Sequence, residues 1–158
     1  MNKLEVLKNV FGYDSFREGQ EQIVDAILKG QDVLGIMPTG AGKSICYQLP
    51  ALMLQGITIV VSPLISLMID QVKALNEAGV HAAYINSALT ENQVTKALHN
   101  AMLGRYKIVY VAPERLETNR FLEFAMNTDI SMITIDDERV IIRTKLEKPS
   151  KIKGLALI

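Results

Sequence analysis

Cysteine and tryptophan are nearly absent from this sequence, which has one cysteine, Cys46, and no tryptophan. A single cysteine excludes a fold held together by intrachain disulfides, and no histidine stands near it as a partner. We therefore interpret Cys46 as a small apolar residue on a helix.

Long apolar runs and an excess of one charge are missing as well. No run approaches the length of about 18 residues that a membrane span needs, and residues 1–16 lack the apolar segment of a signal peptide. We expect a cytoplasmic protein with no membrane partner. The 17 Lys and Arg balance 17 Asp and Glu, so the net charge does not indicate nucleic acid, although it is compatible with a local basic patch.

The remaining composition is that of a globular domain, with 49% hydrophobic and 22% charged residues in 158 positions. Apolar runs alternate with helical patterns along the chain. Helices are predicted at 3–10, 18–29, 43–54, 64–79, 90–103 and 116–127, and strands at 32–37, 57–62, 81–86, 106–113 and 130–136. Strands that are apolar throughout and separated by helices indicate an α/β fold, with a mostly parallel sheet flanked by helices in three layers.

Residues 37–44, MPTGAGKS, are the most informative stretch. Glycines there let the backbone turn so that its N–H groups face phosphate oxygens, and the helix that follows adds a positive partial charge. Lys43 is expected to reach the β- and γ-phosphates, and the Ser44 hydroxyl to hold Mg²⁺. Met37 stands where the full pattern has glycine. The predicted nucleotide-binding residues of this loop are Thr39, Gly40, Ala41, Gly42, Lys43 and Ser44.

A phosphate loop needs a carboxylate that organises Mg²⁺ and water, usually at the end of a buried strand. Asp136 follows the apolar run 130–135 directly and is the predicted Mg²⁺-side acid. Asp137 or Glu138 would then polarise the attacking water. The ligand should lie beyond the carboxyl ends of the strands, where Lys43 and Asp136 both fall.

With these motifs in place, the chain resembles the first RecA-like motor domain of RecQ-type DNA helicases. FGYDSFREGQ (11–20) is similar to the adenine-binding motif of that family. The resemblance implies that Tyr13 and Arg17 stack on the base and that Gln20 pairs with its edge. Residues 37–52 are similar to the family's first motif, which implies ATP and Mg²⁺ as cofactors.

Two further motifs are similar to those that lie along single-stranded DNA in the family, namely VVSPLISLMIDQV (60–72) and YVAPERL (110–116). Ser62 and Ser66 fit either a phosphate contact or a helix cap, and Arg115 fits either the DNA backbone or a pair with Glu117. The DNA-binding residues that the resemblance implies are Ser62, Pro63, Ser66, Gln71, Pro113, Glu114 and Arg115. Single-stranded or forked DNA is the implied partner.

The sequence departs from the family after residue 135. The family's fourth box reads Asp-Glu-Ala-His, whereas this chain has Asp136-Asp137-Glu138-Arg139. In the simplest register Asp137 is the catalytic acid, one methylene shorter than glutamate, so the water-activating role is expected to be impaired. Residues 138–158 resemble neither the family's next loop nor its second motor domain. We therefore divide the chain into a domain at 1–137 and a divergent basic tail at 138–158. The tail fits either a solvated segment or a patch that contacts phosphates.

Several functions remain open at this stage. The first is an ATP-binding helicase motor domain that alone binds ATP and DNA weakly without unwinding. The second is a non-catalytic module that binds nucleotide or a partner protein, and a third is a truncated gene remnant. A small-substrate kinase is disfavoured, since 60–130 contains no arginine-rich lid. The oligomeric state is not predicted.

Overall fold

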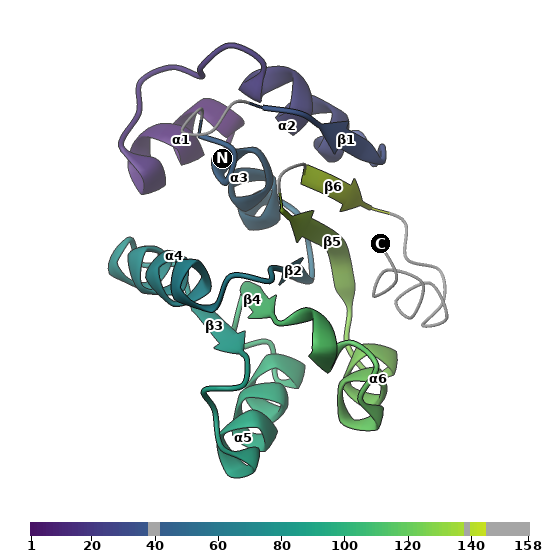
Figure 1. Cartoon of the computed structure of the whole chain (residues 1–158). Helices are drawn as coiled ribbons and strands as arrows, with labels where there is room; N and C mark the ends of the chain where they lie inside the picture. Colours follow the sequence, from purple (N-terminus) through teal and green to yellow (C-terminus); the bar gives the residue numbers. More distant parts are fainter. Residues whose placement is uncertain (38–41, 138–139, 145–158) are drawn as a thin grey trace.

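A six-stranded sheet runs through the centre of the computed structural model, which describes residues 1–37, 42–137 and 140–144. The strand order is β1-β6-β5-β2-β4-β3, and helices cover both faces (Figure 1). The strands are β1 (Val33–Gly35), β2 (Ile57–Val61), β3 (Ala82–Ile85), β4 (Ile108–Val111), β5 (Ile130–Asp136) and β6 (Val140–Arg143). The helices are α1 (Lys3–Phe11), α2 (Gln20–Leu28), α3 (Ile45–Met53), α4 (Ile65–Glu77), α5 (Glu91–Met102) and α6 (Asn119–Met126).

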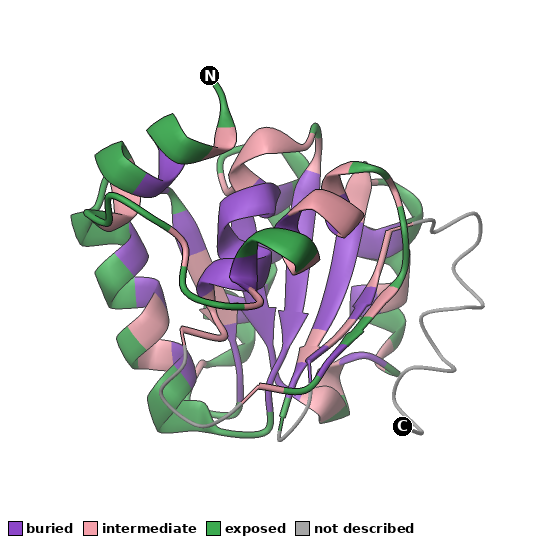
Figure 2. Cartoon of the chain, turned by 90° about the horizontal axis from the view of Figure 1, so that it is seen from above, coloured by how far each residue is buried: buried purple, intermediate pink, exposed green. Residues whose placement is uncertain are grey.

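The sheet is mostly parallel, as the apolar strands predict. β2 pairs in parallel with β4 and β5, and β3 pairs in parallel with β4. All five residues of β2 are buried, because helices lie on both sides of it (Figure 2). The predicted α/β class with a helix-flanked sheet is confirmed.

Two apolar cores lie on the two faces of the sheet. Ile57, Ile59 and Val61 of β2 face α5 and α6, while Val60 faces the core that α3 and α4 share. This alternation follows from the period of two along a strand. A third cluster joins α1 and α2 to the outside of α3 through residues such as Leu7 and Leu49. The segment that precedes the phosphate loop is therefore packed against the helix that follows the loop.

Capping side chains define where several helices begin. Asn2 and Glu5 form a reciprocal capping box at α1, and Thr90 and Gln93 form another at α5. The strand predicted at 106–113 ends at Val111, because Pro113 starts a short 3₁₀ turn, η1 (Pro113–Arg115). The helix predicted from 116 begins only at 119, where the Thr118 side chain caps it.

The sequence did not indicate the direction or the place of β6. The chain turns back after β5, so that Asp136 faces Val140 across an antiparallel pair, and β6 lies between β5 and β1. Val140 and Ile142 are buried and alternate with more exposed neighbours, which is the pattern of a strand with one face on the core. The sheet thus includes four residues from the segment that we read as a basic tail. Residues 138–139 and 145–158 of that segment lie outside the described part of the chain.

In the described part of the chain, no helix is both long and apolar enough to cross a membrane.

Candidate nucleotide-binding site

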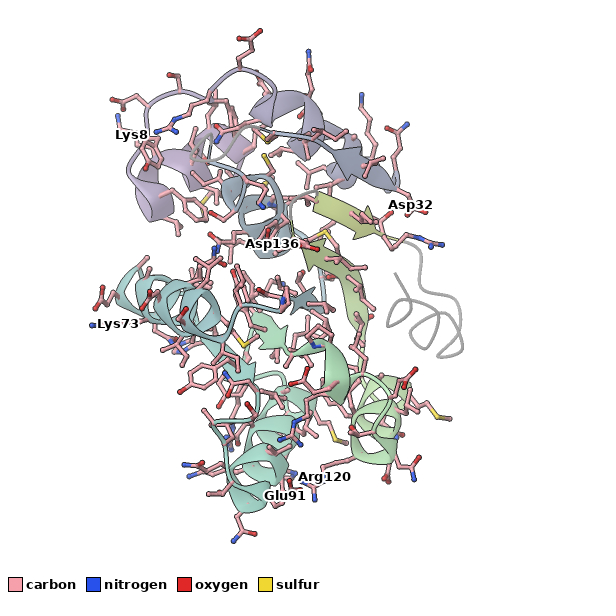
Figure 3. The ribbon with its side chains drawn as sticks, in the orientation of Figure 1. Lys8, Asp32, Lys73, Glu91, Arg120 and Asp136 are labelled. Atoms are coloured by element: carbon pink, nitrogen blue, oxygen red, sulfur yellow. The ribbon has the colours of Figure 1, made fainter. Side chains whose placement is uncertain are left out.

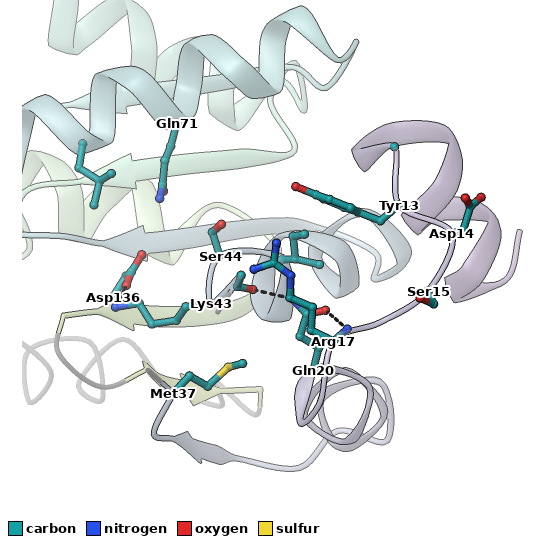
Figure 4. A pocket seen from close by; sticks show the side chains of 14 residues that line it. Tyr13, Asp14, Ser15, Arg17, Gln20, Met37, Lys43, Ser44, Gln71 and Asp136 are labelled. Carbon is teal, nitrogen blue, oxygen red and sulfur yellow. Dashed lines mark hydrogen bonds and ion pairs between the residues drawn. The ribbon is translucent and has the colours of Figure 1, made fainter. Parts of the chain in front are cut away.

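A pocket of about 1140 Å³ opens at the carboxyl end of β5, beside the start of α3 (Figure 4). Four separate stretches of chain form its wall: the connection between α1 and α2, the phosphate loop with the start of α3, α4, and the end of β5. This is where ligands bind in parallel α/β sheets. The sequence-predicted residues that line it are Tyr13, Arg17, Gln20, Gly42, Lys43, Ser44, Gln71 and Asp136.

Lys43 and Asp136 meet inside this pocket, as the predicted pairing of loop and acid requires. The Lys43 Nζ lies 3.0 Å from Asp136 Oδ1 and also donates to the backbone carbonyl of Asp137. The Asp136 side chain is only 4% exposed and that of Lys43 is 28% exposed, so water screens this ion pair weakly. This ion pair therefore joins the phosphate loop, just before α3, to the end of β5.

The second oxygen of Asp136 has a partner that the sequence reasoning missed. The Tyr47 hydroxyl donates to Asp136 Oδ2 at 2.5 Å, from a ring that is fully buried in α3. Burial, together with Tyr110 and Asp136, raises the pKa of Tyr47 well above its usual value, so the phenol keeps its proton. Spacing was the available signal, because Tyr47 follows Lys43 by four residues, which is about one helical turn.

Further polar groups from α3, α4 and β4 extend this contact. The Tyr47 hydroxyl lies 3.2 Å from Gln71 Oε1 of α4 and also interacts with the Tyr110 hydroxyl of β4. Gln48 donates to the Tyr110 oxygen at 2.8 Å. Burial raises the pKa of Tyr110 to about 12. The acid at the end of β5 is thus tied to α3 and β4 through buried groups, and to α4 through the half-buried Gln71.

Gln20 connects the segment before β1 to the phosphate loop. Its Nε2 donates to the Gly42 carbonyl at 3.0 Å, and its Oε1 accepts from the Arg17 backbone N–H at 2.7 Å. Gly42 has φ +73°, and a Cβ there would lie 2.3 Å from Gln20 Nε2, so only glycine fits this close approach. Gln20 is buried, and in the structure its amide holds the loop. The pairing with an adenine edge that the resemblance implies stays a prediction.

Tyr13 and Arg17 stand at the pocket mouth, on the side opposite Asp136 (Figure 4). Both are exposed, and the Tyr13 ring retains 46% of its accessible surface. An exposed phenol and an exposed guanidinium are able to stack on a planar base. Thr39, Gly40, Ala41 and Glu138, which the sequence also nominates, lie outside the described residues.

Ser44 and Asp136 supply the oxygen ligands expected for Mg²⁺, since a hydroxyl and a carboxylate line the same pocket. Mg²⁺ typically takes one or two protein ligands and completes its shell with phosphates and waters. This donor set fits that ion. Among the described residues no group of three or more His, Cys, Asp or Glu is placed to hold a metal by itself.

The predicted DNA-side residues do not share one environment. Ser62 is 2% exposed and its Oγ accepts from the Leu64 backbone N–H at 3.3 Å, which closes the turn before α4. Pro63 and Ser66 are exposed, and Gln71 belongs to the Asp136 network. Among these, only Pro63 and Ser66 offer freely accessible surface at the start of α4.

Pro113, Glu114 and Arg115 form η1 at the end of β4. Arg115 pairs with Glu91 at 3.7 Å and donates to the Asn86 carbonyl at 3.4 Å, so the alternative pair with Glu117 is wrong. The reason is topological, because β3 and β4 are neighbours and their following loops bring α5 beside η1.

Cys46 is fully buried, and burial raises the pKa of its thiol to about 11. Its interpretation as a small helix residue agrees with this inert environment.

Comparison with known proteins assigns a family to this arrangement. Residues 17–148 match the DEAD/DEAH box helicases. The chain belongs to this family. It is 47% identical over 138 residues to the ATP-dependent DNA helicase RecQ of Haemophilus influenzae and 47% identical over 137 residues to that of Bacillus subtilis. The ATP-dependent DNA helicase Q-like 5 of Arabidopsis thaliana is 44% identical over 137 residues.

These matches cover 87%, 86% and 86% of this chain, but only 22%, 23% and 15% of the three relatives. The chain therefore spans less than a quarter of the length of each of these three relatives. The predicted resemblance to RecQ-type helicases, restricted to the first motor domain, is confirmed.

A solved structure supports the fold. The crystal structure of the DUF1998 helicase MrfA bound to DNA and AMPPNP has a TM-score of 0.67 to this chain, at 20% sequence identity. The likeness covers 87% of this chain and 21% of that one. At this identity it bears on the fold alone, and the predicted RecA-like architecture is confirmed.

Proposed function

We propose that this chain is the ATP-binding part of a RecQ-type 3′–5′ DNA helicase motor, and that it holds ATP with Mg²⁺ in the pocket between the phosphate loop and Asp136. The contact between Lys43 and Asp136, inside a pocket that also contains Ser44, is the observation that carries this proposal. Tyr13 and Arg17 at the pocket mouth would take the base.

Nucleotide binding requires Lys43 to exchange partners. A lysine ammonium is a compact point charge on a flexible stem, so it can leave Asp136 for the β- and γ-phosphates. Ser44 and Asp136 would hold Mg²⁺, which neutralises charge on the phosphates during transfer. Asp137 is exposed beside Lys43, and either it or Glu138 would orient the attacking water.

DNA would bind along the carboxyl ends of β2 and β4. Pro63 and Ser66 lie exposed there at the start of α4, and Pro113, Glu114 and Arg115 lie at the end of β4. We expect weak binding of single-stranded or forked DNA that fades with salt, because phosphate contacts release counterions. Unwinding is not expected from these residues alone, since closure of two motor domains drives it in the family. The cytoplasmic location is part of the same proposal.

The proposal is tested by titrating the chain with a fluorescent adenine nucleotide in the presence of Mg²⁺. Lys43→Ala should abolish the binding that the unmodified chain shows, because it removes the phosphate-facing charge. Lys73→Ala is the matched control, since Lys73 is exposed on α4 and lies outside the pocket (Figure 3). Equal nucleotide affinity in Lys43→Ala and the unmodified chain would refute the proposal.

A non-catalytic nucleotide-binding module is the second candidate, favoured by the aspartate at position 137 in place of the family's glutamate. A base displaced by roughly 1 Å costs on the order of 10²-fold in rate. ATP hydrolysis that disappears in Asp136→Asn would count against this candidate, whereas nucleotide binding without turnover would support it.

A further inference from the structure

Asp136 has two side-chain partners in the structure, and the proposed function uses only one of them. Its Oδ1 faces Lys43 at 3.0 Å and its Oδ2 accepts from the Tyr47 hydroxyl at 2.5 Å. When Lys43 turns to the phosphates, Oδ1 is released toward the pocket. The Tyr47 hydroxyl is then the partner that still holds this carboxylate.

Tyr47 is built to stay in place during that exchange. Its ring is fully buried in the core that α3 shares with α4, together with Val60 and Met68. Its hydroxyl has one proton and three acceptors within reach: the Asp136 carboxylate at 2.5 Å, Gln71 Oε1 at 3.2 Å and the Tyr110 hydroxyl oxygen. A charged acceptor binds a hydroxyl proton more strongly than a neutral amide does, so the proton goes to Asp136.

We propose that Tyr47 is a positioning residue for Mg²⁺ binding: its hydroxyl fixes the Asp136 carboxylate so that Oδ1 stays directed into the pocket when Lys43 leaves. This inference rests on the proposed function, because it takes Asp136 as the Mg²⁺-side acid. Groups that hydrogen-bond to a metal ligand without touching the metal typically contribute 10–100-fold to metal affinity. The contact of Gln71 with the same hydroxyl means that α4 is connected to the carboxylate through one oxygen atom.

The test is a Mg²⁺ titration of Tyr47→Phe in the presence of a fluorescent adenine nucleotide. This change keeps the ring and removes the hydroxyl. We expect the Mg²⁺ concentration at half-saturation to rise about 10-fold, while the nucleotide affinity measured in EDTA stays at the level of the unmodified chain. Tyr110→Phe is the matched control, because it removes a buried phenol hydroxyl one contact further from Asp136.

Each outcome decides between a positioning and a merely structural role. A shift in Tyr47→Phe that exceeds the shift in Tyr110→Phe supports the inference. An unchanged Mg²⁺ midpoint in Tyr47→Phe overturns it, and so do equal shifts in both variants, which would reflect a general loosening of the buried hydroxyls. If the unmodified chain binds no nucleotide, the proposed function falls and the inference falls with it.

A second measurement covers the case in which Tyr47→Phe does not fold. The unmodified chain, labelled with ¹³C at the tyrosine ζ carbon, should show the Tyr47 hydroxyl protected from exchange both before and after Mg²⁺ and nucleotide are added. Protection that is lost on addition would overturn the inference.

Discussion

The two ends of the carboxyl edge of the sheet are held together in different ways. At the end of β5, Lys43, Asp136 and Tyr47 form contacts of 3.0 Å or less around a carboxylate that is almost fully buried. At the ends of β3 and β4, Glu91 pairs with Arg115 and Arg120, and the Glu91 side chain is 72% exposed (Figure 3). Buried charges depend strongly on their partners, whereas exposed ion pairs contribute little. Lys43, Asp136 and Tyr47, which we call the nucleotide corner, are therefore held in place before a ligand binds. The ion pairs of Glu91, on the predicted DNA side, are free to rearrange.

The largest expected effect is on Asp136. Asp136→Ala should lower the free energy of unfolding by about 2–3 kcal/mol, because it leaves the Tyr47 hydroxyl buried without its charged partner and releases Lys43. Urea unfolding followed by circular dichroism measures this change.

Glu91→Ala is the control at the other end of the edge. It should cost at most about 1 kcal/mol, and the cost should vanish at high salt. Equal losses in Asp136→Ala and Glu91→Ala would break the comparison between the two ends.

The next effect concerns the close approach of Gln20 to the loop. Gly42→Ala places a Cβ 2.3 Å from Gln20 Nε2 and forces an L-residue to φ +73°, which itself costs about 1–2 kcal/mol. Gly79→Ala imposes a similar φ of +85° with no atom within 4 Å of the new Cβ. We expect similar backbone strain in both variants and weaker nucleotide binding in Gly42→Ala alone. Nucleotide binding that is unaffected in Gly42→Ala would show that the Gln20 contact is dispensable.

A further expected effect is an alkaline loss of stability beside the phosphate loop. Burial raises the pKa of Cys46 from 9.0 to about 11, so the folded state keeps a proton that the unfolded state releases. The stabilisation is complete below pH 9 and should be lost as the pH rises from 9 to 11. Thermal unfolding across this range should show a shallower decline in Cys46→Ala than in the unmodified chain. An identical decline in both would mean that the thiol is not shielded.

Much of the nucleotide corner was predictable because its signals are local. The phosphate loop is one contiguous stretch, and Asp136 follows a run of apolar residues that can only be a buried strand. Parallel strands place their carboxyl ends at one edge, so the meeting of Lys43 and Asp136 follows from the order of the elements. The similarity to RecQ-type helicases added Tyr13, Arg17 and Gln20 to the predicted nucleotide-binding residues, and all three line the same pocket.

Other features depend on which elements become neighbours. The partner of Arg115 is Glu91, 24 residues earlier, because β3 and β4 pair side by side. The hydroxyl of Tyr47 finds Asp136, Gln71 and Tyr110 only once α3, α4, β4 and β5 are packed. β6 lies in the sheet between β5 and β1, although its amino-acid sequence alone favours part of a basic tail.

The sequence by itself therefore determined the α/β class, the phosphate loop and the acid that faces it, because short-range patterns and strand direction specify them. The tertiary structure alone decided how that acid is held, which end of the carboxyl edge is rigid, and where the chain after residue 139 returns to the sheet. Those outcomes are set by contacts between residues far apart in the chain, and by the cost of burying a charge without a partner.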